Sequence, residues 1–330
     1  MRTTGAKGRG GTTTAPVVHP ALGHCARVAL GCINWSVGSV FVLGSINQDY
    51  MLFADRRPRA GETVTGVTTV TRNGGKGANQ AVAAVNSGAA VMMLGRIGDD
   101  VAGFAQRDDL AARGVNVSLV TVTSNVSTGT AFVTVTPDGE NSVLVAPGAN
   151  GLVESGDVKA AASFIANHSV LVAQLEVPLD AVVEAVNLCG SNTHVLLNAA
   201  PFAPLPRALL ERVDTLVVNR VEAAAIVDAP IVGVASALEG ATMLIGHGVR
   251  AAVVTLGADG AAVATAGSCT HVPAPRVSVV DTTGAGDVFV GTLAALLADD
   301  QPVVRAVVIA VERASRSVES IGARAPMPAA

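Results

Sequence analysis

The sequence predicts an α/β fold: a doubly wound, mostly parallel sheet flanked by helices, with a small β-sheet lid. Short, solidly apolar runs, which are typical of strands buried on both faces, alternate with stretches that have the apolar spacing of helices. Two segments rich in Thr and Val interrupt this alternation and indicate antiparallel strands outside the main sheet. In such folds, ligands bind at the carboxyl ends of the parallel strands.

The alternation begins with residues 40–44, "VFVLG", which predict a buried strand. Residues 77–89 predict a helix, because small apolar residues recur at helical spacing and Gly88 can end it. The next strand and helix are expected in "VMMLGRIG" and in "VAGFAQRDDLAARG", the second closed by Gly114. Four further strands are expected, each ending in a polar or glycine residue, over 170–176, 194–199, 215–219 and 251–257.

The interrupting segments are residues 50–72 and 127–147, and "PDGEN" in the second indicates a hairpin turn. We expect them to form the lid, over about 45–75 and 127–150. An exposed sheet of this kind needs its free face covered, which predicts a homodimer through the lid.

Composition limits the classes of function. The chain has 330 residues, 50% of them hydrophobic, enough for one large α/β domain. A net charge of −4 implies no basic face, so nucleic acid is not an expected partner, and no run reaches the roughly 18 apolar residues of a membrane span. A reducing cytoplasm is the expected location, because four widely spaced cysteines form no C-x-x-C pair: Cys25, Cys32, Cys189 and Cys269.

Residues 1–38 differ from the remainder because they are basic, with no acidic residue, and rich in Thr and Gly. A disordered tail or an over-long start is the favoured interpretation. A transit peptide is an alternative. A lipoprotein signal ending at Cys32 is the weakest, since His24 and Arg27 interrupt any apolar region.

Two motifs place polar groups where a neutral polyol could bind. In "GSINQDY", Asn47 and Asp49 alternate and therefore face the same side, and a carboxylate can accept hydrogen bonds from two adjacent hydroxyls. A capping Asp in a turn is the structural alternative. In "AQLEVP", Glu176 ends an apolar run, with a solvated carboxylate as the alternative.

Three glycine-containing motifs could let the backbone come close to a bound anion. "RNGGKGANQA" opens a helix, yet Lys76 lacks the following Ser or Thr of a P-loop, and a helix entry without a ligand is the alternative. "TLGADG" could frame a nucleotide or only connect a hairpin. In "DTTGAGDVFVG", the bare backbone of residues 284–286 lets N–H groups converge on negative charge, directly before the acid Asp287.

In this order along the chain, "GSINQD", "GETVTG", "GGKGANQA", "STG", "QLE", "TLGADG" and "DTTGAGDVFVG" resemble the PfkB family of carbohydrate kinases, over roughly residues 40–328. The resemblance implies that residues 39–328 form a kinase domain. It also implies transfer of the γ-phosphoryl group of ATP to the 5-hydroxyl of D-ribose, giving ribose 5-phosphate, with Mg²⁺ and with K⁺ as an activator. The alternatives are a kinase of deoxyribose, fructose or a nucleoside and, less favoured, a non-catalytic sugar-binding regulator. A Rossmann dehydrogenase is disfavoured, because no G-x-G-x-x-G follows the first strand.

The resemblance also assigns residues to roles. Asp287 matches the catalytic base, and Gly284, Ala285 and Gly286 match the anion hole. The positions that match the sugar site are Asn47, Gln48, Asp49, Gly75, Lys76, Gly77, Ala78, Asn79, Glu176 and Asp287. Those that match nucleotide contacts are Asn219, Thr255, Leu256, Gly257, Ala258, Asp259, Gly260, Gly286 and Asp287. Those that match a monovalent-cation site are Asp281, Thr283, Ser317, Ser320 and Gly322, and Glu222 is the residue linked to magnesium.

Three positions depart from the family pattern. Arg220 replaces an acid in the N-x-x-E motif "NRVE", Val311 replaces an adenine-side His or Asn, and Pro326 replaces a Ser. These departures put magnesium, adenine and potassium binding in doubt. A monovalent ion is still expected beside Asp281, because that carboxylate would otherwise repel incoming phosphates.

Overall fold

The computed structural model describes residues 38–136 and 141–324, all within one compact unit. The expectations for residues 1–37, for the turn at 137–140 and for Pro326 lie outside these ranges.

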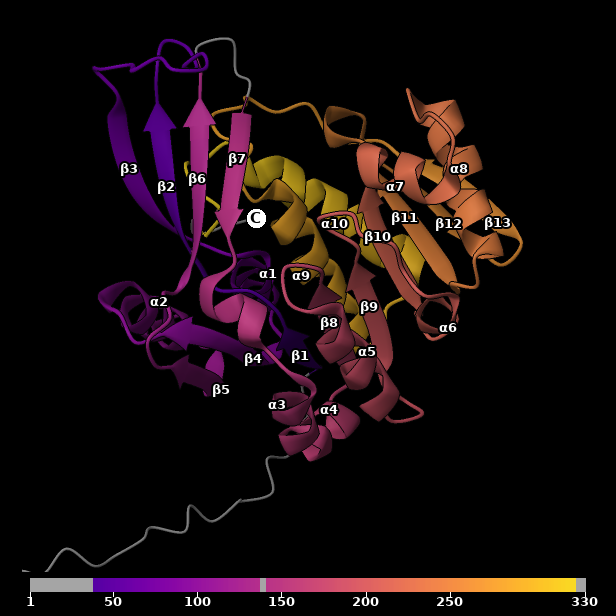
Figure 1. The fold of residues 1–330 in the computed structure, drawn as a ribbon. Coiled ribbons are helices and arrows are strands. Elements are labelled where there is room, and N and C mark those ends of the chain that lie inside the picture. The colour runs from indigo at the N-terminus through magenta and orange to yellow at the C-terminus, as the bar shows by residue number, and fades with distance from the viewer. Residues whose placement is uncertain (1–37, 137–140, 325–330) are drawn as a thin grey trace, which may run out of the picture. The chain divides into compact units, whose positions relative to one another are not determined.

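The larger sheet has nine strands, and its central strands run parallel, as predicted (Figure 1). Only the β11–β12 and β12–β13 pairs of this sheet are antiparallel. In spatial order its strands are β13 (Ser268–Val272), β12 (Ala261–Thr265), β11 (Ala251–Thr255), β10 (Thr215–Asn219), β9 (His194–Asn198), β8 (Val170–Gln174), β1 (Ser39–Leu43), β4 (Ala90–Gly98) and β5 (Asn116–Thr123). Strand β8 was predicted to extend over residues 170–176, but it ends at Gln174, so Glu176 lies in the loop that follows.

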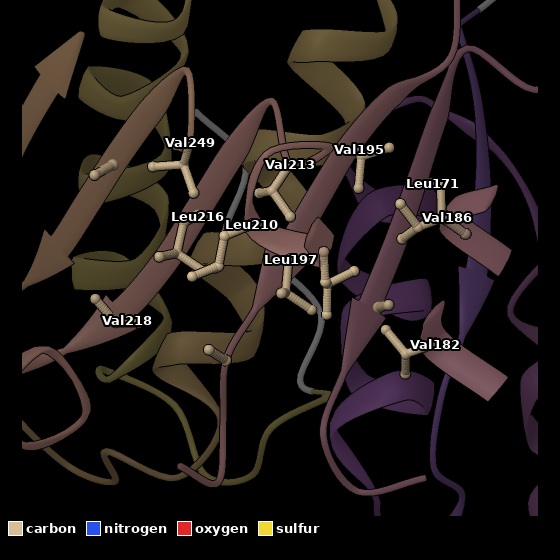
Figure 2. Close-up of a cluster of buried hydrophobic side chains, with 14 of the residues drawn as sticks. Leu171, Val182, Val186, Val195, Leu197, Leu210, Val213, Leu216, Val218 and Val249 are labelled. Carbon is tan, nitrogen blue, oxygen red and sulfur yellow. The ribbon is translucent and has the colours of Figure 1, made fainter. Parts of the chain in front are cut away.

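Apolar side chains cover both faces of this sheet because successive side chains of a strand point to opposite faces. Strand β1 shows the division: Phe41 and Leu43 belong to one buried cluster, whereas Val40 and Val42 belong to another. The first cluster includes Val182 of α5 (Figure 2). Its helices are α3 (Ser155–Ala160), α4 (Ala162–Asn167), α5 (Leu179–Leu188), α6 (Arg207–Leu210), α7 (Arg220–Val227) and α8 (Val234–Gly246).

The helices of the second cluster carry most of the candidate catalytic residues. They are α1 (Lys76–Asn86), α2 (Val101–Ala112), α9 (Ala285–Ala298) and α10 (Val303–Ser317). Helices α1 and α9 pack closely at Gly291, where a Cβ would lie 2.4 Å from the carbonyl oxygen of Gln80. Glycine at this position therefore lets the two helices meet along their backbones.

A separate four-stranded sheet, which we call the small sheet, contains β3 (Thr68–Gly74), β2 (Asn47–Phe53), β6 (Gly129–Val135) and β7 (Asn141–Ala146) (Figure 1). It comprises the segments expected to form the lid. The β2–β3 and β6–β7 pairs are antiparallel as expected, but β2 and β6 pair in parallel. Tyr50 and Phe132 are opposite one another in that pairing, and their rings stack with centroids 5.4 Å apart on an exposed surface.

Candidate active site

The centre of the site is Asp287, on the first turn of α9, whose side chain is buried against α1. Nδ2 of Asn79 donates to its Oδ2 at 3.1 Å, and Nε2 of Gln80 donates to its Oδ1 at 3.0 Å. Burial raises the pKa of Asp287, while Lys76, Gln80 and Asn79 act in the opposite direction. The carboxylate is therefore held in one orientation, with a basicity above that of an ordinary aspartate.

A buried chain of amides fixes these donors. Nε2 of Gln174 donates to Oε1 of Gln80 at 2.6 Å, which turns the amide nitrogen of Gln80 toward Asp287 and toward Oδ1 of Asn198, also at 3.0 Å. Nδ2 of Asn198 then donates to the carbonyl of Val217 at 3.1 Å. None of Gln80, Gln174 and Asn198 was predicted as a site residue, although Gln80 and Gln174 lie within the motifs quoted above.

The predicted anion hole lies at the start of α9, where Gly284 is the N-cap residue and Ala285 and Gly286 are the first helical residues. Gly284 has φ +78°, and a Cβ there would lie 2.2 Å from the Cβ of Ala323. At Gly286, by contrast, no described atom lies within 4 Å of where a Cβ would be. The packing of the protein thus demands glycine at 284 but not at 286, where the bare backbone leaves space open to a ligand.

Asp287 opens into a cavity of about 150 Å³. Both predicted catalytic glycines and several predicted nucleotide residues are among the residues that line it. The full lining consists of Lys76, Asn198, Ala200, Val217, Val218, Asn219, Glu222, Thr255, Gly284, Gly286, Asp287 and Val290. The structure therefore brings Gly284, Gly286 and Asp287 of the predicted catalytic residues to one cavity with Asn219 and Thr255 of the predicted nucleotide residues.

Asn47 and Asp49, which were predicted to contact the sugar, lie at the start of β2. Nδ2 of Asn150 donates to Oδ1 of Asn47 at 2.7 Å, which leaves the Asn47 amide nitrogen available as a donor. Oδ1 of Asp49 is buried without a hydrogen-bond partner among the described residues. Burial, followed by the charges of Glu176 and Asp287, raises the pKa of Asp49 to about 7. An unpartnered buried carboxylate is costly, so this atom is poised to accept a hydroxyl donor.

Lys76 and Glu176 lie beside Asp49. Burial opposes the charge of Lys76, but the surrounding carboxylates, with Asp287 first, raise its pKa. Oε2 of Glu176 accepts hydrogen bonds from the Ser45 hydroxyl and, at 3.1 Å, from the Lys76 N–H, so it also binds the start of α1.

Other predicted sugar residues have structural roles. Nε2 of Gln48 donates to the Arg72 carbonyl within the small sheet, Ala78 is fully buried in the second cluster, and a Cβ at Gly77 would lie 2.6 Å from the backbone of Gly44. Gly75 has φ +89° and precedes the first residue of α1.

Arg324 is a buried residue of the site that the sequence did not reveal. Its Nε donates to Oδ1 of Asn79 at 2.9 Å, and its Nη2 donates to the Gly74 carbonyl at 2.7 Å. Its charge is paired with Asp109 at 2.9 Å. Arg324 thereby orients Asn79, whose amide nitrogen is left to donate to Asp287.

The N-x-x-E motif, which includes the predicted nucleotide contact Asn219, forms a capping box. Oδ1 of Asn219 accepts the Glu222 N–H at 2.9 Å, and Oε2 of Glu222 accepts the Asn219 N–H at 2.8 Å. Arg220 is exposed and lies 4.0 Å from Oδ2 of Asp259, and Val311 is buried in the second cluster. Burial raises the pKa of Glu222.

The "TLGADG" segment connects antiparallel β11 and β12 through the 3₁₀ turn Gly257–Asp259, which is exposed. Thr255 lines the cavity, whereas Leu256 is buried in the first cluster. Of the predicted turn residues, Gly257, Ala258 and Asp259 are exposed, while Gly260 is buried beneath the carbonyl of Val272.

The two predicted metal sites differ in how well their residues fit an ion. Glu222 and Asp287 line one cavity and provide the oxygen donors that Mg²⁺ prefers. Within the described residues, no three His, Cys, Asp or Glu side chains are grouped to hold a metal ion. At the monovalent site, the carboxylate of Asp281 already accepts three hydrogen bonds, including one from Arg72 at 2.7 Å, so both of its oxygens are engaged with donors of the protein. The ion was expected because the charge of Asp281 would otherwise be uncompensated, and Arg72 already compensates it.

Residues 37–330 match the profile of the pfkB family carbohydrate kinases. The chain belongs to this family. The family resemblance of the motifs is thus confirmed, and the chain is a carbohydrate kinase. None of the helices in the described part of the chain has both the length and the apolar composition needed to cross a membrane.

Relatives of this PfkB kinase include proteins named ribokinase and deoxyribokinase. It is 38% identical to the ribokinase of Schizosaccharomyces pombe over 306 residues, 88% of this chain and 95% of the relative. It is 33% identical to the deoxyribokinase of Salmonella typhi over 291 residues, 88% of this chain and 95% of the relative. The solved structure of Arabidopsis thaliana ribokinase complexed with ribose and ATP superposes with a TM-score of 0.79 at 28% identity, covering 88% of this chain and 96% of that one.

Proposed function

We propose that this kinase phosphorylates D-ribose at its 5-hydroxyl, with ATP as the phosphoryl donor, to give ribose 5-phosphate and ADP. The observation that carries the proposal is the buried carboxylate of Asp287, oriented by Asn79 and Gln80 at the start of a helix whose glycine loop lines the same cavity. The relatives named for ribose support the choice of sugar.

Asp287 would accept the proton of the 5-hydroxyl while that oxygen forms a bond to the γ-phosphorus of ATP. The bond from that phosphorus to the bridging oxygen then breaks, and ADP leaves. The backbone N–H groups of Gly284 and Gly286 would bind the charge that grows on the phosphoryl oxygens. The Ala285 N–H, which donates to the Thr282 carbonyl at 3.3 Å, would have to exchange that partner for a phosphoryl oxygen. Mg²⁺, held by Glu222, would offset the charge of the phosphates when bound.

The sugar would bind between β2 and α1. Asp49 would accept two adjacent hydroxyls, because its Oδ1 is buried without a partner among the described residues. The amide nitrogens of Asn47 and Asn79 and the ammonium of Lys76 would donate to the remaining hydroxyl oxygens. Glu176 has one oxygen engaged with α1 and would use the other.

An assay of ADP release over pentoses, hexoses and nucleosides tests the proposal. We expect D-ribose to give the highest kcat/KM and the product to carry phosphate at the 5-position. A higher kcat/KM for 2-deoxyribose would favour the second candidate, which is supported by the Salmonella typhi deoxyribokinase relative. Absence of ADP release with every sugar, by protein that binds ribose, would point to the non-catalytic alternative.

We also propose a cytoplasmic homodimer through the small sheet, now taken as the lid. The exposed apolar side chains of Tyr50, Phe132 and Leu144 support this interface, and the free thiols Cys189 and Cys269 are compatible with a reducing compartment. Leu144→Asp should convert the dimer to a monomer in sedimentation equilibrium; a wild-type monomer would contradict the interface.

A further inference from the structure

Asp281 lies three residues before Gly284, and its carboxylate joins three segments of the chain. Oδ1 accepts the Thr283 N–H at 2.9 Å, and Oδ2 accepts the Gly322 N–H at 3.0 Å. Nη1 of Arg72, in strand β3 of the small sheet, donates to the same Oδ2 at 2.7 Å. The carboxylate therefore connects the glycine loop, the C-terminal loop and the small sheet.

The ion pair is mostly shielded from solvent, since the exposed fractions of the Arg72 and Asp281 side chains are 21% and 16%. Burial opposes ionisation of Asp281, yet the hydrogen bonds from Thr283, Arg72 and Gly322 hold its pKa below the usual range. Screening by salt is weaker for such a pair than for an exposed one. Arg72 thus neutralises the carboxylate next to the loop on which phosphoryl transfer depends.

Both oxygens of Ser317, another residue of the predicted cation site, are engaged with the protein itself. The Ser317 hydroxyl donates to the Ala314 carbonyl at 2.8 Å, and the Ser317 carbonyl accepts the Ser320 N–H at 3.2 Å. Thr283 and Gly322 present N–H groups, not oxygens, to Asp281. A monovalent cation needs converging oxygen atoms, whereas the groups that converge on the Asp281 carboxylate are donors.

Arg72 also connects this loop to the sugar side. Its pairing partner across β2 and β3 is Asp49, and its carbonyl accepts the amide of Gln48 at 2.6 Å. The backbone of Arg72 is therefore fixed within the small sheet, and its guanidinium is fixed by the Asp281 carboxylate.

We propose that Arg72 takes the place of an activating monovalent cation: it offsets the charge of Asp281 and positions the Gly284–Gly286 loop, so that the enzyme turns over without potassium. This inference rests on the proposed kinase function. Arg72 is a positioning residue, since it reaches the reacting groups only through Asp281.

The test compares turnover with saturating ribose and ATP in KCl and in choline chloride of equal ionic strength. We expect equal rates for the wild type. Arg72→Ala should lose roughly tenfold in choline chloride and recover much of that loss in KCl. Arg72→Lys retains a charge and should depend little on potassium. Arg59→Ala, at an exposed residue of the same part of the chain, is the matched control and should behave like the wild type.

A second measurement does not depend on activity. The thermal midpoint of Arg72→Ala should rise in KCl relative to choline chloride, whereas that of the wild type should not change. Potassium activation of the wild type would overturn the proposal, as would an Arg72→Ala variant that responds to potassium in neither measurement. If no sugar is phosphorylated in any salt, the proposed function fails, while the thermal comparison still decides the role of Arg72. If the alanine variant does not fold, the wild-type and Arg72→Lys rates decide it.

Discussion

The side-chain amide of Gln80 donates a 3.0 Å hydrogen bond to Oδ1 of Asp287. Because Asn79 occupies Oδ2 in the same way, both oxygens of the carboxylate are held by neighbouring residues of α1. The orientation of the proposed base therefore depends on the close packing of α1 and α9, which Gly291 permits. Positioning of this kind is set before any ligand binds.

Asp287→Asn should retain the fold and ribose binding but lose about 10²–10⁴ in turnover, because a carboxamide cannot accept the hydroxyl proton. Since burial raises the pKa of Asp287, the acid side of the wild-type kcat/KM profile should lie above the usual titration range of an aspartate. Steady-state rates and calorimetric ribose binding measure both effects. Near-normal turnover by the pure variant would remove Asp287 from the chemistry.

The alternation of strands and helices was predictable because it depends on apolar spacing within short stretches of sequence. Asp287, Asp49 and Asn79 could likewise be chosen as candidate site residues from the sequence, because they lie in motifs whose glycines and acids are close together in the chain. The prediction was wrong where local spacing does not decide the structure. The strand ending at Gln174 was expected to continue to Glu176, and β2 pairs with β6 in parallel although an antiparallel arrangement was expected.

The residues that orient the site could not be predicted because their partners come from distant parts of the chain. Gln80 of α1 contacts Gln174 of β8 because β1 and β8 are adjacent in the sheet. Arg72 and Asp281 are separated by 209 positions, and no local pattern links them. One signal was present: Gln80 is a polar residue within an otherwise small, apolar stretch of a helix, and such a residue needs a buried partner.

Ribose binding should release a proton near neutral pH. The pKa of Asp49 is about 7 in the free protein, mainly through burial, so the carboxyl group is partly protonated there. Hydroxyl donors favour the ionised form and should lower this pKa, so affinity should increase as pH rises through 7. Calorimetry in phosphate and Tris buffers, which differ in ionisation enthalpy, measures the proton. Equal binding enthalpies in the two buffers would contradict this role.

Asp49→Asn should also stabilise the ligand-free protein. The folded-state pKa lies above the unfolded value of 3.8, so the folded state retains a proton that the unfolded state loses, and stability falls as pH rises from about 4 to 7. The gain of the variant should therefore be present at pH 8, on the order of 2 kcal/mol or roughly 5 °C in Tm, and absent at pH 4. A loss of stability at pH 8, together with equal effects on the KM of ribose and of ATP, would mark Asp49 as structural.

Glu222→Gln separates capping from magnesium binding. The amide oxygen of Gln can still accept the Asn219 N–H, so Tm should change little, whereas the lost charge should raise the Mg²⁺ concentration for half-maximal rate. Glu222→Ala is the comparison, since it should also lose about 1 kcal/mol of helix capping. A magnesium titration of Glu222→Gln that coincides with that of the wild type would leave Glu222 with the capping role alone.

The two glycines of the proposed anion hole should respond oppositely to alanine. At Gly284, φ +78° and the approach of Ala323 make a Cβ strained, so Gly284→Ala should destabilise the protein by at least about 1 kcal/mol. At Gly286, on the first turn of α9, a methyl group meets no described atom, and alanine should add roughly 0.5–1 kcal/mol of helix stability. Gly286→Ala should nevertheless lose turnover, because the methyl group would occupy the space into which the phosphates must approach. A Gly286→Ala enzyme with a raised Tm and undiminished kcat would show that the phosphates do not bind at this end of α9.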